Sequence, residues 1–343
     1  MRKPFLYPLL LLLAAGCHNN AGPGSGPDTT GFPAVKRLDS SMRTAFVPVP
    51  DHPGEPGDNI VYAASFALAW DELSRILGGD PESTEPLVRR LNASDIHEGA
   101  LRKEAYRVNM QVQGDDLSVK ASFYKSLPFS VAFDVWEEGM LFGKKQRVRA
   151  FGMKRYDYPQ ASQASVLYYK DDDHFVVSLV AGPENDEMLL AKGFAGGEQL
   201  SVMRSRVERA IAEGKKEMKD DRQAWKFVFN DEDELKIPML KMNLAGDIRE
   251  LISLPVVSRG QTLLIRTAEQ QTLFALDEKG VIVESAAVVD AAAAVMDMPV
   301  PPPRKLMHFD KPFFIMIREN KAKHPYFIMK VANAECMVKE ERK

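Results

Sequence analysis

The sequence has few cysteines, no excess of either charge and no hydrophobic run long enough to span a membrane. Only Cys17 and Cys336 occur among 343 residues, so a framework of disulfide bonds is excluded and a buried core must hold the fold. Lys and Arg total 45 against 48 Asp and Glu, for a formal net charge of -3. This balance argues against a protein that binds nucleic acid.

Motifs of the common enzyme classes are absent as well. The sequence contains no Gly-x-Ser-x-Gly elbow, no His-Glu-x-x-His and no phosphate-binding loop, and its 6 histidines are scattered singly. Residues 171–174 (Asp-Asp-Asp-His) lack the spacing of a calcium loop, and we interpret them as a solvated turn. Residues 215–222 are interpreted as a solvated helix end, and Cys336 as a buried thiol. We expect that the protein binds no cofactor and no metal ion, and that it is not an enzyme.

The N-terminus has the pattern of a signal for export. Arg2 and Lys3 precede an apolar run at residues 9–13, and the small residues Ala14, Ala15 and Gly16 stand before Cys17. This order predicts a signal peptide over residues 1–16. A cysteine in this place is typical of a bacterial lipobox, although Leu13 is one position further away than in the commonest form. We expect Cys17 to be acylated and to anchor the protein to a membrane of the cell envelope. An ordinary signal peptide with an incidental cysteine is the alternative.

The rest of the chain indicates a lipidated flexible tether over residues 17–33 and one domain over residues 34–343. The tether is rich in Gly, Pro, Asn, Ser and Thr and has almost no apolar side chains to bury. The domain mixes strand and helix patterns without a regular β-α-β repeat, so the predicted class is α+β. The predicted strands and helices cover residues 59–77 (a strand that passes into a helix ended by Gly78 and Gly79), 116–124, 143–153, 175–181, 200–219, 236–243, 247–252 and 263–276.

The C-terminal part of the domain has an order of segments that resembles the end of a serpin. A strand and turn at residues 273–280 are followed by a Val/Ala-rich stretch, three prolines at 301–303, and two apolar strands at 307–317 and 326–334. The resemblance implies a serpin-like fold with several sheets and an exposed reactive loop at about residues 280–304. It also implies that the protein acts as a suicide substrate of serine proteases and is a monomer. A protease cuts the loop, and the N-terminal half of the loop then enters the central sheet as a new strand.

The residues after Gly280 can be tested against the alternation that such a strand needs. Both acidic residues before position 297, Glu284 and Asp290, lie on one face. The other face is uncharged; its members are Val281, Val283, Ser285, Ala287, Val289, Ala291 and Ala293. The first charge on that face is Asp297, and burial of its carboxylate would be costly. Insertion is therefore expected to stop before Asp297. A low-complexity linker or a helix at 291–294 are the alternative interpretations.

The resemblance assigns the hinge to Glu278, Lys279, Gly280, Val281 and Val283. Counting from the hinge glycine, it places the reactive bond at Ala294 or Val295; counting back from the strand after the loop, it places the bond near residue 300. Because insertion must end before Asp297, we expect the bond within residues 294–296. Its candidate residues are Ala294, Val295 and Met296, with Val295–Met296 preferred. These small and medium apolar side chains suit an elastase-like or subtilisin-like protease.

Several positions depart from the family pattern. Ala63 and Phe66 stand where serines help the central sheet to open, and Gln270 stands where a histidine faces them. The segment 92–115 is too short for all the elements that the family places there, and Val281 and Val283 are bulky for a hinge. A non-inhibitory binding or structural lipoprotein with the same fold is therefore an alternative, and a hydrolase without a recognisable motif is a third class.

Overall fold

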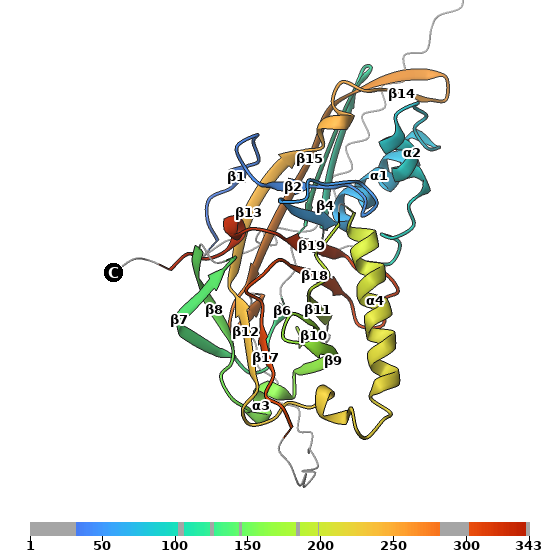
Figure 1. The fold of residues 1–343 in the computed structure, drawn as a ribbon. Coiled ribbons are helices and arrows are strands. Elements are labelled where there is room, and N and C mark those ends of the chain that lie inside the picture. Colours follow the sequence, from blue (N-terminus) through green and yellow to red (C-terminus); the bar gives the residue numbers. More distant parts are fainter. Residues whose placement is uncertain are drawn as a thin grey trace, which may run out of the picture. The chain divides into compact units, whose positions relative to one another are not determined.

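The computed structural model describes residues 32–101, 106–123, 127–143, 146–182, 186–197, 199–281 and 302–340 (Figure 1). Residues from Gly31 onward form one compact unit. Within the described residues the architecture is α+β, with three larger sheets, a two-stranded ribbon and four α-helices. The predicted signal peptide, Cys17, Val283 and the predicted reactive bond at 294–296 lie outside the described residues.

Sheet A has two parallel strands in its middle. Its order is β1 (Lys36–Arg37), β13 (Leu240–Asp247), β15 (Gln261–Leu276), β5 (Asp116–Phe123) and β4 (Tyr106–Gln113), and β14 (Pro255–Ser258) pairs with β15. β15 runs parallel to β5, whereas β13 and β4 run antiparallel to their neighbours β15 and β5. The pairs of β15 and β5 extend from Leu264 with Asp116 to Thr272 with Phe123. The predicted strands at 116–124 and 263–276 are thus confirmed, and they lie side by side.

Sheet B forms the main core with sheet C. The order in sheet B is β2 (Thr44–Phe46), β3 (Asn59–Ala63), β19 (Phe327–Val331), β18 (Phe313–Arg318), β11 (Asp186–Lys192), β10 (His174–Ala181) and β9 (Ala164–Asp171). Every residue of β3 and β19 is buried, which matches their mainly apolar sequences; the polar exceptions are Asn59 and Lys330. The order in sheet C is β17 (Leu306–His308), β12 (Glu234–Pro238), β8 (Gln146–Met153) and β7 (Asp134–Phe142). The ribbon pairs β16 (Gly280–Val281) with β6 (Leu127–Pro128).

The helices cover the sheets at two places. α1 (Ala64–Leu77) continues directly from β3 and ends at Gly78, whose φ of 71° is left-handed, as the sequence predicts. It packs on β5 and β4 of sheet A and, with α2 (Pro86–Ala93), closes a second core. α4 (Leu200–Glu217) packs on β9 and β10 of sheet B (Figure 1). The short helices are α3 (Tyr158–Ala161), η2 (Ala224–Phe227), η3 (Arg249–Leu251) and η4 (Ala334–Cys336). Over the described residues, no helix is long and apolar enough to cross a bilayer.

Two predicted elements are wrong in detail. The single strand expected at residues 236–243 divides after Pro238 into β12, in sheet C, and β13, in sheet A. Pro238 has no N–H to continue a ladder, and the N–H of Met239 donates instead to Arg149 O at 2.9 Å. The helix expected at 247–252 is only the single 3-10 turn η3, because Ile248 has a non-helical backbone.

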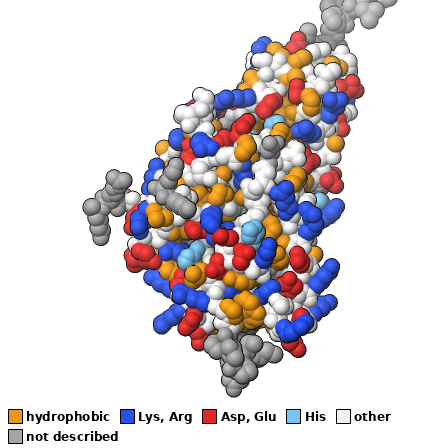
Figure 2. Space-filling view, viewed as in Figure 1, with side chains coloured by type: hydrophobic (Ala, Val, Ile, Leu, Met, Phe, Trp, Pro, Cys, Tyr) orange, Lys and Arg blue, Asp and Glu red, His pale blue; other side chains and the backbone are white. Residues whose placement is uncertain are grey.

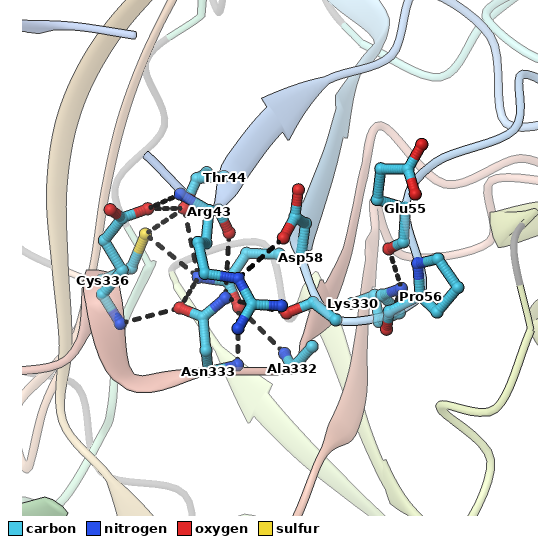
Figure 3. A network of polar contacts seen from close by, with 12 residues as sticks. Arg43, Thr44, Glu55, Pro56, Asp58, Lys330, Ala332, Asn333 and Cys336 are labelled. Atoms are coloured by element: carbon cyan, nitrogen blue, oxygen red, sulfur yellow. Dashed lines mark hydrogen bonds and ion pairs between the residues drawn. The ribbon is translucent and has the colours of Figure 1, made fainter. Parts of the chain in front are cut away.

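A buried polar network fastens the start of β3 to the end of β19 (Figure 3). The side chain of Asn59 accepts the N–H groups of Ala332 and Asn333 at 2.9 and 3.0 Å. Its amide donates to Thr44 Oγ1 at 3.1 Å and Asn333 Oδ1 at 2.9 Å, so a fully buried residue uses all of its hydrogen-bonding groups. Cys336 lies beside them as a buried thiol, as predicted, and burial raises its pKa to about 11.

Candidate functional site

The predicted hinge forms a tight turn at the end of β15. Asp277 Oδ1 accepts the N–H of Lys279 at 2.9 Å, and desolvation raises the pKa of this half-buried carboxyl. Gly280 has a φ of 102°, which favours glycine. A Cβ on Gly280 would also collide with the backbone of Leu127 and Phe129. Only glycine therefore fits at this corner.

The turn directs the chain back along β15 and next to β6. Gly280 pairs antiparallel with Pro128 of β6 on one side and bridges antiparallel to Asp277 on the other. The carbonyls of Glu278 and Lys279 accept the N–H groups of Phe133 at 2.8 Å and Phe129 at 2.9 Å. The described hinge residues are thus held by backbone bonds from the segment that follows β5.

β15, the strand of sheet A that leads into this hinge, carries buried polar side chains. Gln270 of β15 is fully buried; its amide donates to Thr272 Oγ1 at 3.2 Å, and its Oε1 has no hydrogen-bond partner among the described residues. Ala63 and Phe66, at the positions where the family has serines, are fully buried as well. Their apolar side chains offer no hydrogen bond to Gln270 Oε1.

The other end of the loop is held by a buried ion pair. Lys305 and Asp233 have no exposed side-chain surface, and Lys305 Nζ lies 2.6 Å from Asp233 Oδ2. The ammonium also donates to Trp225 O at 3.0 Å and Val228 O at 2.9 Å, while Lys305 N–H donates to Asp233 Oδ1 at 2.7 Å. Desolvation lowers the pKa of Lys305 below its usual value, and the bond to Asp233 opposes the shift.

The acidic turn at residues 171–173 contacts the chain that follows the loop. Asp172 Oδ1 accepts the N–H of Leu306 at 2.9 Å, and Asp173 binds Lys311 at 2.7 Å and Lys192 at 3.0 Å. These two cations hold the pKa of Asp173 at about 2, below its ordinary value of 3.8. No cluster of metal-binding side chains occurs among the described residues. The interpretation of a turn between strands is confirmed for β9 and β10, but its carboxylates are engaged with the chain after the loop and not only with solvent.

Figure 2 shows Lys and Arg side chains mixed with Asp and Glu over the visible face, so this face has no extended field of one sign. The candidate site consists instead of the backbone of the predicted hinge and the buried ion pair of Lys305 and Asp233 at the other end of the loop. Sequence reasoning identified Glu278, Lys279, Gly280 and Val281, but it missed Asp233 and Lys305. A lone Asp and a lone Lys far apart in the chain give no signal of their pairing.

Comparison with known families finds one match. Residues 204–334 match the family described as Serpin (serine protease inhibitor). The C-terminal part of the chain therefore matches the serpin family. The matched residues run from within α4 through β12, β13 and β15 to just past the end of β19. Members of the family are in general protease inhibitors rather than enzymes. No curated protein matches the sequence.

Solved structures of serpins resemble the fold. A serpin from the trematode Schistosoma haematobium has a TM-score of 0.40 at 13% identity, over 63% of this chain and 56% of that one. SRPN18 from Anopheles gambiae has a TM-score of 0.39 at 16% identity, with the same coverage of 63% and 56%. Human thyroxine-binding globulin has a TM-score of 0.39 at 14% identity, over 80% of this chain and 67% of that one. The chain therefore spans a little over half the length of the two invertebrate serpins.

Proposed function

We propose that this serpin inhibits serine-type endopeptidases as a suicide substrate, through the loop between the β16 hinge and Arg304. The observation that supports this function best is the place of Gly280. It pairs antiparallel with the segment after β5 on one side and bridges antiparallel to Asp277, just past β15, on the other. Gly280 and Val281 thus run in the direction that a new strand between β15 and β5 would take.

The topology of sheet A suits the entry of such a strand. A strand between two parallel neighbours can run antiparallel to both, and antiparallel pairing is slightly more stable per residue than parallel pairing. Entry must break the pairing of β15 with β5, and the new strand replaces it with a ladder on each side. The alternation after Gly280 places an uncharged face toward the core, down to Ala293.

The chemistry of inhibition is that of an interrupted proteolysis. The serine Oγ of the protease attacks the carbonyl carbon of Val295, and its proton passes through the protease histidine to the leaving amine of Met296. The C–N bond breaks and an acyl ester to the protease remains. If the freed N-terminal half of the loop inserts before water cleaves the ester, the protease is carried along and distorted.

A non-inhibitory serpin is the second candidate, and the residues under sheet A favour it. The unpaired Oε1 of Gln270 and the apolar Ala63 and Phe66 leave the sheet without the polar contacts that help it to open. Slow opening lets the protease complete hydrolysis and leave. The protein would then be cut without trapping its protease.

The test is incubation with an elastase-like and a subtilisin-like protease, followed by denaturing electrophoresis and mass spectrometry. We expect a covalent complex of protease and serpin, and release of a C-terminal fragment that begins at Met296. A fragment without any complex favours the non-inhibitory candidate. A dominant cut after Arg304 or Lys305 would show that both the bond and the protease class are wrong.

We also propose that the protein resides in a bacterial cell envelope, anchored by lipid on Cys17. The proposal rests on the residues before Cys17 and on the polar, Gly- and Pro-rich stretch behind it. Cys17→Ser should block processing or release the protein from the membrane fraction. A variant that is processed normally and stays with the membrane contradicts the lipid anchor.

A further inference from the structure

The loop region contains only two basic residues. Between Lys279 and Lys311 the sequence has Arg304 and Lys305 and no other Lys or Arg. A trypsin-like protease, which cuts after basic side chains, therefore has no other bond to attack in this part of the chain. Whether it can cut here depends on how Arg304 and Lys305 are held.

On the C-terminal side of the bond between Arg304 and Lys305, hydrogen bonds and burial hold the chain in place. The N–H of Lys305 donates to Asp233 Oδ1 at 2.7 Å, its carbonyl accepts the N–H of Glu234 at 3.0 Å, and its side chain is fully buried. The next N–H, of Leu306, donates to Asp172 Oδ1 at 2.9 Å. A protease that cuts after Arg304 must hold the chain on both sides of that bond. It would first have to withdraw Lys305 from its buried carboxylate.

The Arg304 side chain is held more weakly. Its guanidinium pairs with Glu234, but 48% of its side-chain surface is exposed. Ion pairs at the surface contribute little, so a protease pocket can compete with Glu234 for this side chain. The pair of Lys305 and Asp233 is buried, so water cannot take the place of a lost partner and the loss is costly. Asp233 therefore provides most of the restraint.

We propose that Asp233, assisted by Glu234, is a specificity-determining residue that withholds the Arg304–Lys305 bond from trypsin-like proteases. The inference rests on the proposed function. In a serpin whose reactive bond follows an apolar residue, this restraint prevents the basic residues at the end of the loop from offering a second cleavage site. Hydrolysis of this bond would add water across the C–N bond, leaving a carboxylate on Arg304 and an amine on Lys305. Asp233 acts on this reaction only by holding Lys305 in place.

The experiment measures cleavage by trypsin at one bond in the full chain. We expect Asp233→Asn to increase the rate of cutting after Arg304 at least about tenfold, because the buried ammonium loses its counter-ion. Glu234→Gln should change this rate by less than about threefold, as expected for an exposed pair. Mass spectrometry of the fragment that begins at residue 305 reports this bond and no other.

A rescue and a control separate positioning from general loss of stability. Asp233→Asn combined with Lys305→Met removes both charges at similar volume, so cutting after Arg304 should return close to the wild-type rate. Asn59→Ala weakens the distant network at β3 and should leave this rate unchanged. Rapid cutting of the wild type after Arg304, or the same increase in Asn59→Ala, would overturn the proposal.

Hydrogen exchange provides a further measurement. If Asp233→Asn does not fold, hydrogen exchange of the wild type decides: strong protection of the Lys305 and Leu306 amides is expected, and unprotected amides contradict the proposal. The rate of cutting after Arg304 is measured independently of whether the protein inhibits a protease. A serpin that never traps an elastase-like protease would therefore disprove the proposed function and leave the restraint by Asp233 intact.

Discussion

At the scale of single residues, Asn59 has the clearest energetic role. Asn59→Ala truncates a fully buried side chain and leaves the part-buried N–H groups of Ala332 and Asn333 without their acceptor. Each unpaired buried group costs about 1–3 kcal/mol, so we expect a loss of about 3 kcal/mol in the free energy of unfolding. The midpoint of urea denaturation, followed by circular dichroism, measures the loss.

Asn243 provides the matched control for this prediction. It is also buried, but it makes only side-chain bonds of 3.0 Å to Pro33 O and from Gln271. Asn243→Ala orphans no backbone N–H and should cost about 1 kcal/mol. Equal losses in the two variants would show that the backbone acceptor role of Asn59 is not what stabilises β3 against β19.

A second residue, Asp173, makes the stability of the fold depend on pH. Lys311 and Lys192 lower the pKa of its carboxyl from 3.8 to about 2. The unfolded chain therefore takes up this proton first, and the contribution of Asp173, present above pH 3.8, is lost as the pH falls toward about 2. Because half of the side chain is exposed, solvent screening limits the contribution to less than about 1 kcal/mol.

The measurement compares wild type with Asp173→Asn in urea between pH 7 and pH 2. The variant should be slightly less stable at neutral pH, and the difference should close as the wild-type carboxylate becomes protonated. A difference that persists unchanged to the lowest pH would mean that the contact does not depend on the charge of Asp173.

At the scale of elements, the proposed inhibition depends on the strand that begins at the predicted hinge. Replacing Val281 with threonine and Val283 with alanine reduces bulk in the entering strand and should raise the ratio of trapped to cleaved serpin. Val283→Arg places a charge on the face that must be buried, at a cost of several kcal/mol, and should turn the protein into a pure substrate.

Gel densitometry of complex against cleaved serpin measures this ratio at a fixed amount of protease. Glu284→Arg is the control, since the alternation predicts position 284 on the exposed face of the inserted strand, where a charge should be tolerated. If Val283→Arg traps the protease as well as the wild type does, the loop does not insert.

At the scale of the whole molecule, loop insertion should change thermal stability. We expect cleavage by an elastase-like protease to raise the melting temperature by about 20 °C or more, because the new strand adds a ladder on each side of sheet A. Scanning calorimetry before and after cleavage measures the shift. A cleaved protein that melts at the same temperature as the intact one would assign the chain to the non-inhibitory candidate.

The sequence by itself determined the class of fold, most of the long elements and the turn at residues 277–280. Continuous apolar runs predicted buried strands such as β10, Gly78 predicted the end of α1, and the Asp-Glu-Lys-Gly motif predicted the turn that ends at Gly280. These features depend on local chemistry: alternation, helix-ending glycines and turns act over neighbouring residues. The strand β4 was missed because its half-buried face, with Val108 and Met110, becomes useful only against β5 and α1.

Only the tertiary structure decided what lies on either side of the loop. Pro238 divides one apolar segment between two sheets, and Asp233 meets Lys305 across 72 positions of sequence. The acidic run 171–173 indicates a solvated turn by its sequence alone, but the carboxylates of Asp172 and Asp173 contact Leu306 and Lys311 after the loop. Pairing of this kind depends on where the core brings distant segments together, and buried charges are kept only where that packing supplies their partners.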